Sequence, residues 1–199
     1  MDGQHQNILL LIQRMEQKDS IILGIDPGTT ILGYGIIECR GGKMKILCMG
    51  NFRLSKLSDH GLKLREIQKQ VSALIESYLP DEMAIEAPFY GKNVQSMLKL
   101  GRAQGVAIAA AMEREVPYTE YAPKKIKQAI TGNGNASKEQ VAAMLQSLLK
   151  IETLPKNLDA TDGLAAAVCH YFNRGKSSEK AGYSGWESFL GKNPHRKIT

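Results

Sequence analysis

The sequence predicts an α/β domain in which helices flank one mixed β-sheet, and two observations favour this class. Three short apolar stretches come first, and they indicate consecutive strands. Further strand-like stretches then alternate with helical ones. Consecutive strands pair as antiparallel hairpins, whereas strands separated by helices return in parallel, so one mixed sheet accommodates both patterns. With 199 residues, 43% of them apolar, the chain is large enough for one such domain with a sizeable core.

The first half of the chain supplies three strands and one helix. The apolar stretches that predict the strands are residues 21–26, 33–39 and 44–51. Gly41-Gly42 lies between the last two, and because glycine adopts positive φ without strain, we expect a hairpin turn there. Ser58-Asp59 then precedes apolar residues at helical spacing, which predicts a capped helix that Pro80 ends.

The second half of the chain alternates strands with helices. We expect strands at residues 82–87 and 116–121, and helices at residues 93–115, 123–131, 137–149 and 159–172. Asn93 and the capping box at residues 137–140 mark two helix starts, and Gly132 marks a helix end. Residues 133–136 are expected to form a flexible connection. The helix at 93–115 carries Gly101, Gly105 and several alanines, which suit close helix packing or a subunit interface.

The predicted domain covers residues 21–172, and segments of different composition lie on either side. Residues 1–20 are polar apart from the apolar cluster at 8–12, so we expect a flexible extension. Residues 173–199 are rich in glycine, serine and lysine, and we expect a poorly ordered basic tail. The early apolar cluster is far shorter than the ~20 residues of a membrane span, and it lacks the features of a signal peptide.

Charge and cysteine content restrict the environment and the partners. A formal net charge of +6 is consistent with an acidic partner such as nucleic acid. Cys39, Cys48 and Cys169 show no CxxC spacing, which excludes a cysteine-based zinc site. An odd number of unpaired cysteines suits a reducing compartment, so we expect a cytoplasmic protein without membrane contact.

Four acids stand where their surroundings make a charge costly. Asp26 and Glu86 each end an apolar strand just before a proline, and Asp159 and Asp162 share one helix face. Taken singly, Asp26 suits a turn, and the two helix acids suit the helix dipole. However, like charges three residues apart on a helix repel, and glutamate is rare in strands and in cores. Because hard divalent cations prefer carboxylate oxygens, the four acids together predict a site for one or two Mg²⁺ ions.

Basic residues lie between Glu86 and the last helix. They are Lys92, Lys99, Arg102, Lys124, Lys125, Lys127 and Lys138. A solvated basic face explains any one of them. Lys127 and Lys138 lie near a helix start or a glycine loop, and we expect these two to contact phosphates. His60 and His170 have no metal-ligand spacing, and the sequence has no Walker A motif.

Four motifs resemble the RuvC family of Holliday-junction resolvases, which has the RNase H-like fold. The motifs are residues 24–28 with 33–35, residues 84–86 with Phe89 and 92–93, residues 98–106, and residues 159–165. Each motif alone is weak, but all four in this order and spacing are highly specific. The resemblance covers roughly residues 21–171, so residues 1–20 and the tail with Trp186 lie outside it.

The resemblance implies a crossover junction endodeoxyribonuclease. Such an enzyme resolves four-way junctions in DNA recombination and repair by paired symmetrical nicks that leave 5′-phosphate and 3′-hydroxyl ends. Its metal-binding catalytic carboxylates would be Asp26, Glu86, Asp159 and Asp162, with two Mg²⁺ ions per subunit and Mn²⁺ as a substitute. Phe89 would stack on a base near the crossover, and Lys127 and Lys138 would bind DNA. The resemblance also implies a homodimer that works beside the branch-migration proteins RuvA and RuvB.

Two other functions stay open at this point. Residues 26–30 also resemble the phosphate loop of sugar kinases and actin-like ATPases, but those proteins need a second such domain to close over ATP. A non-catalytic junction-binding protein of the same fold would normally have lost one or more acids, and all four are present here.

Overall fold

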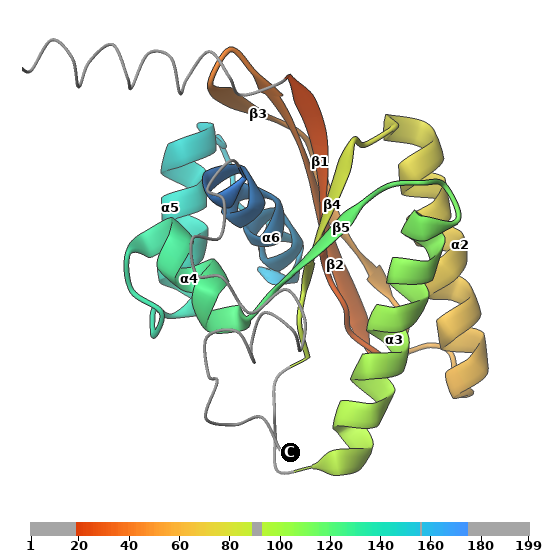
Figure 1. The fold of residues 1–199 in the computed structure, drawn as a ribbon. Coiled ribbons are helices and arrows are strands. Elements are labelled where there is room, and N and C mark those ends of the chain that lie inside the picture. Colours follow the sequence, from red (N-terminus) through yellow and green to blue (C-terminus); the bar gives the residue numbers. More distant parts are fainter. Residues whose placement is uncertain (1–18, 89–92, 156, 175–199) are drawn as a thin grey trace, which may run out of the picture.

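The computed structural model describes residues 19–88, 93–155 and 157–174. Its strands are β1 (Ser20–Asp26), β2 (Ile31–Arg40), β3 (Lys43–Arg53), β4 (Glu82–Glu86) and β5 (Tyr118–Tyr121). Its helices are α2 (His60–Tyr78), α3 (Val94–Met112), α4 (Pro123–Thr131), α5 (Lys138–Leu149) and α6 (Asp159–Asn173). Helices α2 and α3 cover one face of the sheet, and α4, α5 and α6 lie on the other face (Figure 1). The expected layers are confirmed.

The sheet is mixed, as predicted, and has the strand order β3-β2-β1-β4-β5. Strands β1, β2 and β3 pair antiparallel, whereas β4 pairs parallel with both β1 and β5. The β2–β3 turn contains Gly41 and Gly42 at φ of 55° and 74°, which is the left-handed conformation expected there. Strand β1, the first along the chain, is therefore the middle strand of the sheet, and it pairs antiparallel with β2 on one side and parallel with β4 on the other.

Most helix ends fall where the sequence places them. Asp59 and Asn93 each accept a hydrogen bond from a backbone amide three residues on, and Ser137 forms the full capping box with Gln140. Gly132 ends α4 in the left-handed conformation with φ of 76°. Thus local side-chain chemistry sets these boundaries.

Two expectations about the connections are wrong. Strand β5 begins at Tyr118 rather than at Val116, because the Val116 amide donates to the Ala111 carbonyl and so closes the end of α3. The connection at residues 133–136 is not a free linker, since the Gly134 amide donates to the Gln128 side chain and the Asn135 amide to that of Asn133.

Two hydrophobic cores lie on opposite faces of the sheet. The core under α2 and α3 includes Leu23, Ile25 and Ile85, and the core under α4, α5 and α6 includes Ile22 and Ala84. Within the described ranges no helix is both long and apolar enough to cross a membrane.

Candidate active site

The alternation of side chains along β1 and β4 places Asp26 and Glu86 on the same face of the sheet. Successive residues of a strand point to opposite faces. Ile25 and Ile85 lie in the core under α2 and α3, so the acids that follow them face α6. Because Ile25 pairs with Ile85 in parallel register, Asp26 and Glu86 end neighbouring strands at the same edge of the sheet.

Close contact between α6 and β2 brings the other two acids to this edge. A Cβ on Gly163 would lie 2.5 Å from the Tyr34 Cα, and a Cβ on Gly33 would lie 2.2 Å from the Asp159 carbonyl oxygen. Real Cβ atoms do not approach other atoms so closely, so only glycine permits the helix backbone to rest on the strand. The first turn of α6, which carries Asp159 and Asp162, is thereby held against the strand that pairs with β1.

Three of the predicted acids and both predicted lysines line one cavity of about 350 Å³. The lining residues are Asp26, Glu86, Pro123, Ile126, Lys127, Lys138, Val141, Asp162 and Ala165. Asp159 does not line the cavity but joins it through an ion pair with Lys138. Side chains up to 136 residues apart in the sequence, from Asp26 to Asp162, therefore meet at one place.

Burial and mutual repulsion disfavour the charged forms of the two strand-end acids. Burial, followed by the negative charge of Asp162, raises the pKa of Asp26 to about 7. Burial, followed by the charges of Asp26 and Asp162, raises the pKa of Glu86 to about 8. Burial is therefore the main reason why the charged forms are disfavoured, and the neighbouring acids add to the effect.

Lys138 resolves the repulsion between the two helix acids. Its Nζ lies 2.6 Å from Asp159 Oδ1 and 2.6 Å from Asp162 Oδ2. The hydrogen bond from Lys138 holds the pKa of Asp159 below its usual range. Burial outweighs the same contact at Asp162 and raises its pKa. The sequence indicated that both acids needed a partner but did not identify Lys138 as that partner.

The structure describes one of the two remaining predicted DNA-binding residues, Lys127, but not the other, Phe89. Lys127 lines the acidic cavity, and its Nζ donates to the Ala136 carbonyl oxygen at 2.8 Å. The structure does not test the predicted contact of Lys127 with DNA, so that role stays a prediction. Phe89 lies outside the described residues, so its predicted role is not tested by the structure.

The donors in the cavity fit a hard divalent cation. They are carboxylate oxygens, which Mg²⁺ and Mn²⁺ prefer. Burial is the main cause of the raised pKa values of Asp26 and Glu86 and the neighbouring carboxylates add to it, so a cation among these acids would favour their charged forms. As the side chains stand in the described part of the chain, no three acids, histidines or cysteines are arranged to hold an ion. Lys138 occupies the carboxylates of the helix pair instead.

Sequence reasoning missed one side chain that supports the site. Gln104 is buried on α3, and its amide donates to the Glu86 carbonyl oxygen at 3.3 Å and to Glu120 Oε2 at 2.8 Å. It thus joins α3 to the end of β4, where Glu86 lies. The feature of the sequence that could have identified Gln104 is its position as a polar residue near the alanines of α3.

A mixed sheet of this order, with acids at the ends of its first and fourth strands and at the start of its last helix, is typical of RNase H-like nucleases. Residues 22–170 match the family described as "Crossover junction endodeoxyribonuclease RuvC". The chain belongs to this RuvC family, whose members are metal-dependent nucleases that act on phosphodiester bonds.

Relatives of the same description match nearly the whole chain. A protein from Christiangramia forsetii is 63% identical over 180 residues, which are 90% of this chain and 94% of the relative. One from Bacteroides fragilis is 62% identical over 181 residues, covering 90% of this chain and 96% of the relative. Both are called crossover junction endodeoxyribonuclease RuvC.

Solved structures agree with this family. A Thermus thermophilus RuvC structure in complex with Holliday junction substrate superposes with a TM-score of 0.71 and 32% identity, over 77% of this chain and 93% of that one. A yeast mitochondrial Holliday junction resolvase shares the fold, with a TM-score of 0.58 and 16% identity over 83% of this chain and 84% of that one. The RNase H-like fold predicted from the sequence is confirmed, and the comparisons do not support an actin-like ATPase or a non-catalytic binding protein.

Proposed function

We propose that the chain resolves four-way Holliday junctions in recombination and repair by paired, symmetrical nicks. The observation that carries this proposal is the cavity shared by Asp26, Glu86, Asp162, Lys127 and Lys138. The acids that line it suit metal ions, and the lysines that line it suit the phosphates of DNA. Family membership supplies the junction as the substrate.

We assign the four acids as metal ligands and catalytic carboxylates. Asp26 ends the central strand β1 and is electrostatically coupled to Glu86, Asp159 and Asp162, so it is the ligand that two ions would share. Glu86 would serve one ion, and the α6 pair would serve the other. Two Mg²⁺ ions, or Mn²⁺ in their place, would supply a hydroxide nucleophile and stabilise the leaving oxygen.

Side chains beside the acids would hold the DNA in place. Lys127 and Lys138 approach the cavity from α4 and from the start of α5, so they would contact phosphates on either side of the scissile bond. Phe89, which follows Glu86 by three residues in the sequence, would stack on an unpaired base near the crossover, as the family resemblance implies. Phosphate contacts of this kind make affinity fall steeply with salt.

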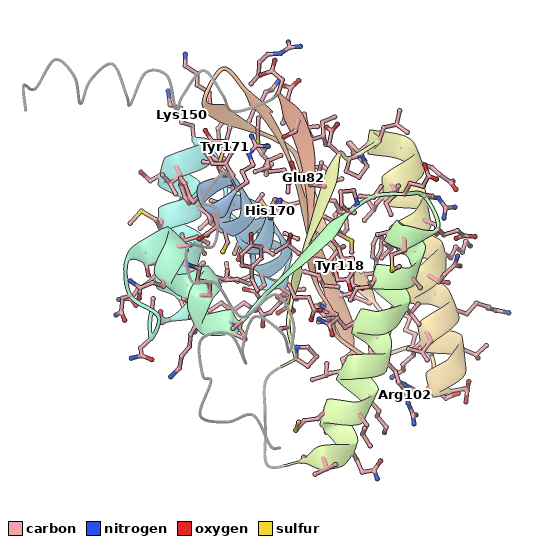
Figure 2. The ribbon with its side chains drawn as sticks, in the orientation of Figure 1. Glu82, Arg102, Tyr118, Lys150, His170 and Tyr171 are labelled. Carbon is pink, nitrogen blue, oxygen red and sulfur yellow. The ribbon has the colours of Figure 1, made fainter. Side chains whose placement is uncertain are left out.

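An apolar stripe on α3 supports a homodimer. Val94, Leu98 and Met112 are 63%, 50% and 61% exposed, and they share one helix face with Gly101 and Gly105. A Cβ at either glycine would meet open space. Large apolar side chains around small ones let two helices pack closely, so we propose that a second copy covers this stripe. Figure 2 labels Arg102, which lies on the same helix.

The two-fold symmetry of such a dimer matches that of the substrate. A four-way junction is pseudo-symmetric about its crossover, so two identical sites would reach strands of like polarity. The branch-migration proteins RuvA and RuvB are the proposed partners.

We further propose that the nuclease domain spans residues 21–172, with residues 1–20 and 173–199 as extensions. We also propose that the protein works in the cytoplasm.

A synthetic four-way junction tests the proposed function. With Mg²⁺ present, we expect nicks at matching positions on two opposed strands that DNA ligase can seal, whereas a linear duplex of the same sequence stays intact. EDTA should abolish the nicks, and a buffer without ATP should not. Equal cutting of the linear duplex, or cutting that persists in EDTA, would refute a metal-dependent junction resolvase.

A further inference from the structure

Lys138 occupies the oxygen atoms that a metal ion on α6 would need. Its ammonium group contacts one carboxylate oxygen of Asp159 and one of Asp162, both at 2.6 Å. The three side chains are 38%, 28% and 25% exposed, so the contact is partly shielded from water. A charged pair in such surroundings is stronger than one on an open surface.

The second lysine of the cavity does not share this role. Lys127 donates to the Ala136 carbonyl oxygen, although it lines the same cavity. Within the described residues, Lys138 is therefore the side-chain cation in ion-pair contact with the predicted metal ligands.

The helix cap fixes the backbone that carries Lys138, whereas the side chain is held only by its contacts with the two acids. Ser137 caps α5 by accepting from the Gln140 amide, and the Gln140 side chain accepts from the Ser137 amide. Lys138 is the first residue after this cap, and its flexible stem can move without a change in the helix. Movement of one side chain thus suffices to open the Asp159 and Asp162 oxygens.

We propose that Lys138 is a built-in counterion that a divalent metal ion must displace from Asp159 and Asp162. The inference rests on the proposed metal site. In the metal-free protein the lysine keeps the two acids together at the start of α6, at the cost of weaker metal binding. Once displaced, the ammonium is free for the phosphate contact proposed above.

Binding of Mn²⁺ to the DNA-free protein, followed by electron paramagnetic resonance, tests the displacement directly. Lys138→Met should bind Mn²⁺ at least about tenfold more tightly than the unaltered protein, because no cation competes for the oxygens. Lys138→Arg keeps the competing charge and should bind about as weakly as the unaltered protein. Lys124→Met removes the same charge from an exposed position on α4 and should change the affinity less than about twofold.

A fourth variant separates this inference from the proposed metal site. Asp162→Asn should weaken Mn²⁺ binding at least about tenfold, because it removes a ligand. If Asp162→Asn has no effect, the metal site itself is wrong. If Asp162→Asn weakens binding but Lys138→Met matches Lys124→Met, the site stands and the counterion role is wrong.

The effect of Mn²⁺ on thermal unfolding gives a second readout, because Mn²⁺ would not compensate for the loss of a purely structural lysine. In EDTA, Lys138→Met should melt several degrees below the unaltered protein, because the two acids are left to repel. Saturating Mn²⁺ should close this gap, since the ion replaces the lysine. A gap that persists at saturation would overturn the proposal. Lys138→Gln, which can still donate to either acid, serves in the same test if the methionine variant does not fold.

Discussion

Glu82 and His170 join β4 to α6: Glu82 Oε2 lies 2.5 Å from His170 Nε2 (Figure 2). The other ring nitrogen of His170 lies 2.8 Å from the Tyr121 hydroxyl, so the buried imidazole is satisfied on both sides. Glu82 begins the strand that Glu86 ends, and His170 lies near the end of the helix that Asp159 begins. One contact therefore fixes the two elements that carry three of the four acids.

We expect Glu82→Gln to lower the free energy of unfolding by about 1–3 kcal/mol at neutral pH, because it weakens a charge-assisted hydrogen bond. The bond from His170 holds the pKa of Glu82 below its usual range. The stabilisation is therefore present above the carboxyl's ordinary pKa and is lost as the pH falls through the lower, folded-state value. Urea unfolding across this pH range measures the difference, with Glu66→Gln on α2 as the control. An unchanged difference in acid would contradict this account.

Asp26→Asn should abolish Mg²⁺-dependent cleavage and leave junction binding largely intact. The amide is nearly the same size as the carboxylate but is a poor ligand for a hard cation. We expect a loss of at least about a thousandfold in the rate of nicking, with a gel-shift affinity in Ca²⁺ within a few fold of the unaltered protein. Glu66→Gln should cleave normally. Cleavage at an equal rate by Asp26→Asn would remove this residue from the site.

Asp26→Asn should also stabilise the metal-free protein at alkaline pH. Burial raises the pKa of Asp26 to about 7 from the 3.8 of a free side chain, so the folded protein binds this proton more tightly than the unfolded chain does. Stability without metal then falls as the pH rises from 3.8 through 7. In EDTA the variant should melt a few degrees higher at about pH 8.5 and level with the unaltered protein at about pH 4. Calorimetry checks this, and Mg²⁺ should reverse the order at the higher pH.

Gly163→Ala should destabilise the fold and impair cleavage together. The added Cβ would lie 2.5 Å from the Tyr34 Cα, so α6 must move off β2 and take its acids with it. Overpacking of this kind costs about 1–3 kcal/mol or more. Ser147→Ala is the control, because Ser147 is exposed on α5, away from the acids and from the proposed dimer face, and alanine favours a helix. Thermal unfolding at one protein concentration should separate the two variants, and equal melting temperatures would argue against the close contact.

Leu98→Asp should convert a dimer to a monomer. Leu98 lies within the apolar stripe of α3 and is 50% exposed, so a charge there would be buried in the proposed interface. Met144→Asp is the control, since Met144 is 40% exposed on α5, on the other face of the sheet. Sedimentation equilibrium measures the mass of each variant. A Leu98→Asp protein that remains dimeric would place the subunit contact elsewhere.

Local chemistry in the sequence was enough to predict most elements. Caps such as Asp59 and Ser137 act within one helical turn, and Gly41-Gly42 acts within one hairpin, so neighbouring residues decide these features. The strand acids Asp26 and Glu86 stood out for a related reason, because an apolar run that ends in a carboxylate is a local conflict. The family resemblance added the function, and the comparisons confirmed it.

Only the tertiary structure decided which groups meet. Gly33 and Gly163 show no local sign of being opposed, yet their contact sets the position of Asp159. Lys138 carries the same charge as the other basic residues between Glu86 and the last helix, and only the packing of α5 beside α6 makes it the partner of Asp159 and Asp162. The physical reason is range: hydrogen bonds and dihedral preferences act between neighbours in the chain, whereas burial and charge pairing depend on distances in space that exist only once the sheet and its helices have packed.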